Sequence, residues 1–164
     1  MRASAIKTAI GSAFLVTAIF AWAQSRKPGL WETTSTMTLQ QSPFPAGMPN
    51  SPNSPFGGGP RTTQVCLTQE QIDKYGAPTP ASHDCQITNV VLKPHGMTAD
   101  MVCSGRTTGK GIVESTWSED GTATGTVHFV GTIQAGPQPR PIEWTSHSTS
   151  VYKGADCGSV KPIQ

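Results

Sequence analysis

The chain has 164 residues, of which 13% are charged, and its formal net charge is +2. Arg2 and Lys7 account for this excess, because the 141 residues that remain after the first 23 of the 164 carry ten basic and ten acidic side chains. A neutral domain lacks the basic face that nucleic acids require, so the composition argues against nucleic-acid binding. A length of 141 residues is typical of a single domain.

The first 23 residues have the pattern of a cleavable signal peptide. Arg2 and Lys7 precede an apolar stretch over residues 9–21, which closes with Ala21-Trp22-Ala23. This small-x-small ending is typical of a cleavage site, and the stretch is shorter than the roughly 20 residues that cross a bilayer. We expect cleavage between Ala23 and Gln24, a periplasmic or secreted location, and a single domain over 24–164 with no transmembrane segment. The alternative is an uncleaved N-terminal anchor.

The first half of this domain predicts two strands separated by a long loop. Residues 29–40 are rich in β-formers and alternate, with one face made by Trp31, Thr33, Ser35, Met37 and Leu39. Residues 42–60 hold six prolines and a run of three glycines, which predicts a long exposed loop or a disordered insertion. Residues 61–67 predict a second, short strand.

A short helix is expected directly after the second strand. Thr68 stands three residues before Gln71, which is the spacing of a capping box. Gly76 and Pro78 then end the helical pattern, so we expect a two-turn helix over residues 68–75.

The second half predicts consecutive β-hairpins. Residues 85–93 and 97–104 flank a Pro-His-Gly turn, residues 109–118 and 121–130 flank an Asp-Gly turn, and a last strand covers 141–152. The pattern therefore indicates an all-β fold, mainly an antiparallel meander of about seven strands with one short helix, of sandwich or half-barrel type.

Alternation in the last two strands separates an apolar face from a polar one. Val127 and Phe129 point away from Thr124, Thr126 and His128. In the last strand, Ile142 and Trp144 are opposed by Glu143, Thr145, His147 and Thr149. We therefore expect a sheet with one solvated, threonine-rich side.

The four cysteines, Cys66, Cys85, Cys103 and Cys157, favour two disulfides in an oxidising compartment. The first hairpin places Cys85 nearly opposite Cys103, within the span of a bridge. This favours Cys85–Cys103 with Cys66–Cys157. The rival pairing, Cys66–Cys85 with Cys103–Cys157, remains open.

No catalytic or cofactor motif is present in the sequence. No serine lies in a G-x-S-x-G elbow, and no phosphate loop, dinucleotide fingerprint, helix–turn–helix or EF-hand occurs. We expect a protein that is not an enzyme and has no cofactor. His128, His147 and Glu143 share the polar face and are candidate ligands for a divalent metal, although the sequence favours solvated histidines.

Several local motifs together resemble a known family. Pro28-Gly29-Leu30-Trp31-Glu32 is followed by Gln64-Val65-Cys66-Leu67-Thr68-Gln69-Glu70-Gln71, then by Cys85 and Cys103, and finally by Gly154-Ala155-Asp156-Cys157. This order resembles the secreted bacterial family catalogued as domain of unknown function 3617. Ala155 departs slightly from its usual Gly-Asp-Cys ending. The resemblance implies a periplasmic location and supplies no activity.

Three functional hypotheses follow. The first is an envelope-associated binding module whose curved sheet holds a small apolar ligand or a protein partner, because so little helix is available to cover an apolar sheet face. The second is a metal-handling protein or an enzyme that uses the face of His128, His147 and Glu143. The third is a structural protein that engages a partner through loop 42–60.

Overall fold

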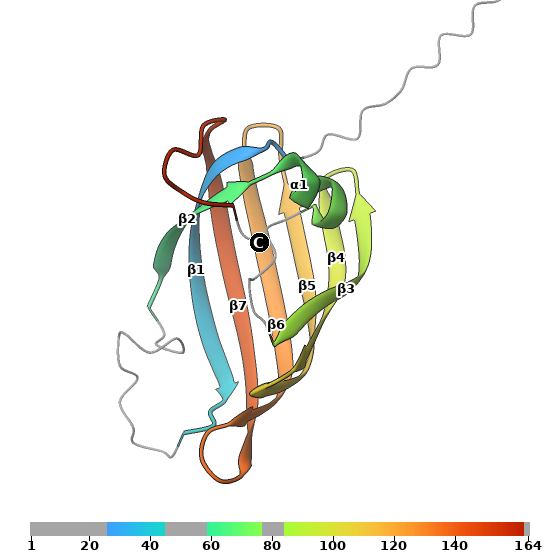
Figure 1. Cartoon of the computed structure of the whole chain (residues 1–164), viewed down its shortest axis with the longest axis vertical. Coiled ribbons are helices and arrows are strands. Elements are labelled where there is room, and N and C mark those ends of the chain that lie inside the picture. Colours follow the sequence, from blue (N-terminus) through green and yellow to red (C-terminus); the bar gives the residue numbers. More distant parts are fainter. Residues whose placement is uncertain (1–25, 45–58, 77–83, 163–164) are drawn as a thin grey trace, which may run out of the picture.

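The computed structural model describes residues 26–44, 59–76 and 84–162. In these ranges the chain forms one seven-stranded sheet and one helix (Figure 1). The elements are β1 (Gly29–Gln41), β2 (Arg61–Leu67), α1 (Gln69–Tyr75), β3 (Cys85–Lys93), β4 (Gly96–Ser104), β5 (Thr107–Trp117), β6 (Thr122–Gln134) and β7 (Pro139–Gly154). The predicted signal peptide and most of loop 42–60 lie outside the described residues.

All neighbouring strands are antiparallel, in the order β2-β1-β7-β6-β5-β4-β3. Strands β3 to β7 form a meander of hairpins. The first strand of the chain, β1, pairs with the edge of β7 that β6 leaves free. The edges of the sheet are β2 and β3, so the curved sheet stays open (Figure 1). The predicted all-β meander is confirmed. The sandwich alternative is wrong, because the strands make a single sheet.

Helix α1 has the predicted cap. The Gln71 backbone N–H donates to Thr68 Oγ1 at 3.2 Å, and the Thr68 N–H donates to Gln71 Oε1 at 3.0 Å. Gly76 ends the helix with φ 67°, a left-handed conformation that glycine adopts without a Cβ clash. Among the described residues, no helix is long and apolar enough to cross a membrane.

The strand register assigns every strand residue to one of two faces. Phe129 pairs with Trp144, Val127 with Ser146, and Leu39 with Trp144 from the other side of β7. These residues point into the curve of the sheet, and we call this side the inner face. Thr124, Thr126 and His128 fall on the opposite, outer face, as the alternation predicts.

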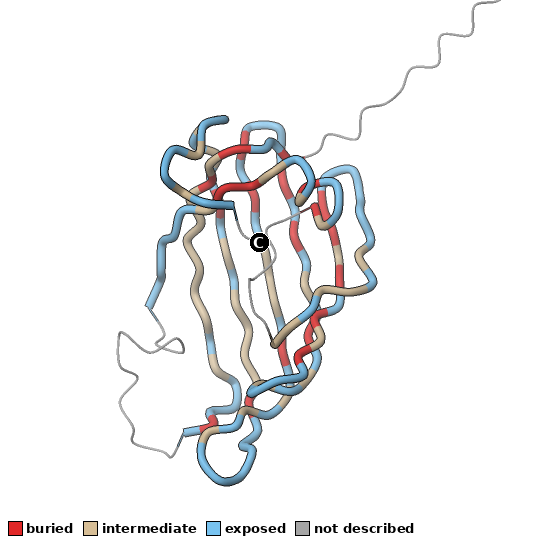
Figure 2. The backbone as a smooth tube through the Cα atoms, viewed as in Figure 1, coloured by how far each residue is buried: buried red, intermediate tan, exposed pale blue. Residues whose placement is uncertain are grey.

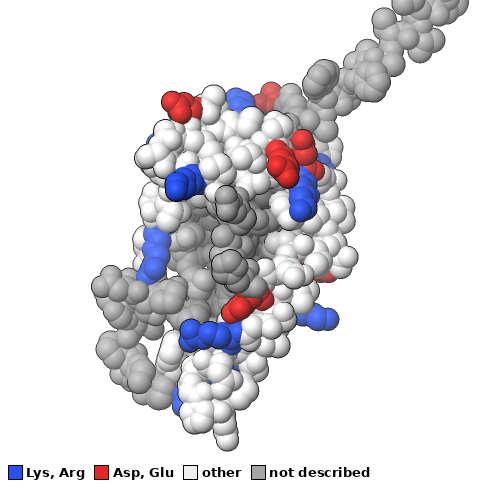
Figure 3. Space-filling view, in the orientation of Figure 1, with Lys and Arg blue, Asp and Glu red and all other residues white. Residues whose placement is uncertain are grey.

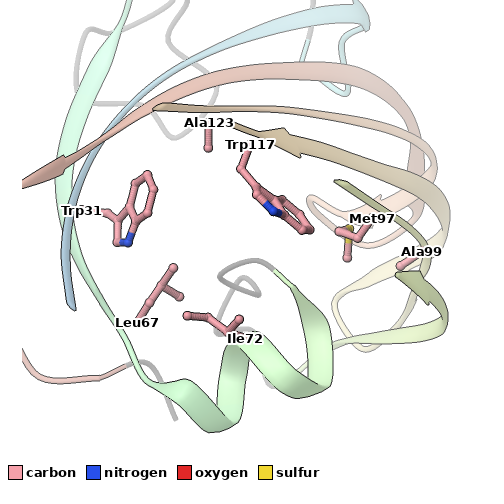
Figure 4. Close-up of a cluster of buried hydrophobic side chains, with 7 residues drawn as sticks. All are labelled: Trp31, Leu67, Ile72, Met97, Ala99, Trp117 and Ala123. Carbon is pink, nitrogen blue, oxygen red and sulfur yellow. The ribbon is translucent and has the colours of Figure 1, made fainter. Parts of the chain in front are cut away.

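Two buried clusters occupy the ends of the inner face. At the end that carries α1, the helix-end cluster fills the curve between helix and sheet (Figure 4), and consists of Trp31, Leu67, Ile72, Met97, Ala99, Trp117 and Ala123. At the opposite end, the far-end cluster consists of Met101, Cys103, Phe129 and Ile142. The two clusters meet along β4, whose inner residues are all buried, and Ile87 and Val113 pack against both of them. The inner face is half-buried in the middle of β1, β6 and β7 (Figure 2).

A glycine pair lets the sheet bend at the far end. Gly109 lies opposite Gly131. A Cβ at Gly131 would collide with the Thr108 carbonyl oxygen, and a Cβ at either position would meet the ring of Phe129. Since side chains there would push the strands and the ring apart, these glycines permit both the curvature and the close cover by Phe129.

Each end of the sheet also carries one disulfide. Cys85 and Cys103 are opposed on β3 and β4 at the far end. Cys66 on β2 joins Cys157 at the helix end, across 91 positions of sequence. This is the pairing that the hairpin in the sequence favours. The rival pairing would require a bridge between Cys103 and Cys157, which lie at opposite ends of the sheet.

Candidate binding face

The middle of the inner face, between the two clusters, is half-buried and lined by small polar residues. We call these residues on β1 and β7 the polar strip: Thr33, Ser35, Ser146, Ser148 and Ser150. All except Ser150 keep intermediate exposure, and the middle of β1 is correspondingly tan in Figure 2. The helix contributes its buried side chain, Ile72, at one end only.

Two hydroxyls of the polar strip have no hydrogen-bond partner among the described residues. Thr33 Oγ1 and Ser150 Oγ lie 2.9 Å apart, and Ser148 Oγ donates to the Gly125 carbonyl oxygen at 3.3 Å. Within the described part of the chain, the side chains of Ser35 and Ser146 form no hydrogen bond. They leave hydrogen-bonding capacity in the centre of the face for water or for a bound molecule.

Apolar and aromatic side chains flank the polar strip. Trp144 stacks on Phe129 with ring centroids 5.5 Å apart, and Trp31 meets Tyr152 edge-on at 5.4 Å. On the neighbouring strands, Val113 lies opposite Val127, and both are half-buried. The face therefore combines a wide apolar surface with a few central hydroxyls, which is the usual chemistry of a small-molecule site.

Charge is distributed unequally between the two faces of the sheet. The register places the acidic residues of the strands on the outer face: Glu32, Asp100, Glu114 and Glu143. The charged strand residues at inner positions are both arginines, Arg61 opposite Ser35 and Arg140 opposite Ile133. On the side of the molecule seen in Figure 3, charged side chains stand apart in small groups among mostly uncharged atoms. The inner face is thus free of carboxylates along its described strands.

A third arginine, Arg26, lies at the helix end of the inner face, away from Arg61 and Arg140. Its guanidinium carbon lies 4.2 Å from the centroid of the Trp31 ring, and the residue is only 4% exposed. Its Nε is buried without a hydrogen-bond partner among the described residues. Desolvation by burial lowers the pKa of Arg26 to about 10, so the group stays protonated at neutral pH. Arg26 is not predictable as a site residue from the sequence, because no local pattern distinguishes a buried arginine from an exposed one.

The first and last sequence motifs of the family resemblance meet at this same end. Trp31 Nε1 donates to the Lys27 carbonyl oxygen at 2.9 Å, and Tyr152 Oη donates to the Pro28 carbonyl oxygen at 3.2 Å. A Cβ at Gly29 would collide with the Gly154 backbone, so the first and last motifs require this close approach. Glu32 forms a surface ion pair with Lys153 at 3.1 Å. The motif Pro28–Glu32 therefore closes the inner face at the helix end.

The metal candidates lie on the outer face and only two of them come together. His128 Nε2 lies 3.1 Å from Glu143 Oε1, with both side chains more than a third exposed. His147 instead has its Nδ1 3.3 Å from Thr126 Oγ1. In the described ranges, no group of three histidine, cysteine or acidic side chains could hold a metal ion. The pair is a surface contact.

Comparisons with known proteins place the chain in a family without supplying an activity. Searches of the curated proteins and of the solved structures found no match. The family model described as "Protein of unknown function (DUF3617)" matches residues 26–157, a range that contains both disulfides and the candidate binding face. The chain belongs to this family of proteins of unknown function, DUF3617.

Proposed function

We propose that this protein is a non-enzymatic binding module that holds a small apolar ligand on its inner face. The observation that carries the proposal is the half-buried middle of that face on β1, β6 and β7, which contrasts with the fully buried inner residues of β4. A sheet that served only as scaffold would bury this surface under a second layer. Here one short helix packs at one end, and the apolar surface beyond it suits a ligand.

The shape of the face favours an elongated ligand. The inner side chains run from Trp31 and Tyr152 at the helix end, past Val113 and Val127, to Phe129 at the far end. Each methylene that leaves water on such a surface contributes about 0.8 kcal/mol. A single alkyl chain can follow this path, while the hydroxyls of the polar strip remain available to water or to a polar group.

Binding is tested with a neutral alkyl probe and a pair of matched variants. We expect delipidated protein to bind 1-dodecanol saturably with 1:1 stoichiometry. Ser146→Phe, which fills the middle of the inner face, is expected to weaken binding at least tenfold, because the ring occupies the path of the chain. Isothermal titration calorimetry measures both affinities.

Thr149→Phe is the control, since Thr149 is exposed on the outer face of the same strand. It should bind 1-dodecanol as the wild type does. Unchanged binding by Ser146→Phe, with circular dichroism showing a folded protein, would place the ligand elsewhere. No saturable binding by the wild type would remove the proposed function.

We also propose that the protein acts outside the cytoplasm, after cleavage between Ala23 and Gln24. Two disulfides support an oxidising compartment, and the signal-peptide pattern supports export. The full chain expressed in a bacterial host is expected to yield a periplasmic protein whose N-terminal residue is Gln24. Mass spectrometry of the intact protein measures this, and a mature protein that retains residues 1–23 would contradict it.

A further inference from the structure

Arg26 is a buried cation without an anionic partner among the described residues. Glu32 pairs with Lys153 and His128 with Glu143, and neither of these ion pairs involves Arg26. Its nearest defined interaction is the stacking on Trp31 at 4.2 Å. A cation that is 96% buried normally has a carboxylate or several acceptors beside it, because burying an unpaired charge is costly.

Stacking on Trp31 accounts for only part of this arrangement. The face of an indole ring attracts the guanidinium charge, but it accepts none of the five N–H donors that arginine presents in one plane. The Nε donor in particular is buried and unsatisfied in the described structure. The arginine is therefore held in place from one side while its hydrogen bonds remain available.

The charges on the inner face of the sheet favour an anionic ligand. Arg61 and Arg140 are the other charged residues at inner positions of the strands, and the acidic strand residues all lie on the outer face. An anion that enters the inner face thus meets positive charge without a competing carboxylate on the described strands. Arginine is also the side chain best suited to a planar carboxylate, which it binds through two parallel hydrogen bonds.

We propose that the ligand of the inner face is a single-chain amphipathic carboxylate, of the fatty-acid class, whose carboxylate pairs with Arg26. Its alkyl chain then extends from the helix end, past Val113 and Val127, toward Phe129 and Trp144. This assignment rests on the proposed function, because it deepens the binding of an apolar chain to the same face. It adds the anionic headgroup as the determinant of specificity.

The experiment compares four probes with the same C12 chain: dodecanoate, 1-dodecanol, dodecyl phosphate and dodecyltrimethylammonium. Titration calorimetry at pH 8, below the critical micelle concentrations, should show the wild type binding dodecanoate at least tenfold more tightly than 1-dodecanol. The cationic probe should bind more weakly than either. Arg26→Met keeps the length and the apolar contact with Trp31, and it is expected to abolish the preference while 1-dodecanol binding changes less than twofold.

Lys27→Met is the matched control, because it removes the same charge from the adjacent, exposed residue. It should retain the tenfold preference. Arg26→Gln serves as a second variant should Arg26→Met fold poorly, and it is expected to lose the preference in the same way. Folding of each variant is verified by its thermal melting curve.

The possible outcomes separate this inference from the proposed function. Equal binding of dodecanoate and 1-dodecanol by the wild type overturns the carboxylate assignment and leaves the apolar site intact. A preference that survives Arg26→Met, or that Lys27→Met also abolishes, overturns the role of Arg26. Tighter binding of dodecyl phosphate than of dodecanoate overturns the carboxylate as the ligand class. Binding of none of the probes removes the proposed function together with this inference.

Discussion

Removing the Cys66–Cys157 disulfide with Cys66→Ala/Cys157→Ala is expected to lower the free energy of unfolding by about 4–5 kcal/mol. The bridge spans 91 positions, so its loss frees the unfolded chain to sample a much larger set of conformations. In the folded state, the bridge also holds the C-terminal segment against β2 next to Leu67, which is 1% exposed. Urea denaturation followed by circular dichroism measures the change.

The Cys85–Cys103 disulfide provides the matched comparison. It spans only 18 positions and joins two strands that the hairpin already pairs. Cys85→Ala/Cys103→Ala is therefore expected to cost about 3 kcal/mol, less than the loss of the longer bridge. A larger loss for the Cys85–Cys103 variant would contradict the view that Cys66–Cys157 is the main covalent constraint on the sheet.

Trp31→Ala is expected to destabilise the domain by about 4 kcal/mol. The side chain is 1% exposed in the helix-end cluster, and its loss would leave a cavity between β1, Leu67 and Ile72 (Figure 4). The Lys27 carbonyl oxygen also loses the hydrogen bond from Trp31 Nε1. Since natural domains are stable by only about 5–15 kcal/mol, this variant lies near the limit of folding. Chemical denaturation at 25 °C measures the effect.

Two controls bracket the Trp31→Ala result. Trp31→Phe keeps an aromatic ring but not the indole N–H, so it should be clearly less destabilising than Trp31→Ala. Val130→Ala removes an exposed outer-face side chain and should change stability by less than about 0.5 kcal/mol. A loss for Trp31→Ala no larger than that for Val130→Ala would mean that the helix-end cluster is not the core of this domain.

The position of Trp31 also shows why the sequence motifs of this chain are spaced as they are. Residues 28–32 lead into β1, Cys66 is the residue before the last one of β2, and Gly154 ends β7. All three lie at the helix end of the sheet. Gly29 approaches the Gly154 backbone, and Cys157, three residues after Gly154, forms the disulfide with Cys66. Motifs far apart in the sequence thus assemble one end of the inner face, beside Arg26.

Local chemistry made much of the secondary structure predictable. The capping box of Thr68 and Gln71 and the left-handed Gly76 delimit α1 because these signals act within a few residues. Strand β7 runs over Pro139–Gly154 and extends beyond the predicted 141–152, since it pairs with β6 along its length and with β1 as well. Pairing with neighbouring strands extends a strand beyond the residues whose local propensity predicts it.

By itself, the sequence determined the strands, the helix, the two faces of β6 and β7, and the disulfide between the strands of the first hairpin, because turn chemistry and alternation act over short distances. Only the tertiary structure decided that β1 lies between β7 and β2, that the sheet stays a single open layer, and that Arg26 is buried against Trp31. These features depend on contacts between distant segments. The burial of a charge is a property of what packs around it, and no local pattern in the sequence records that.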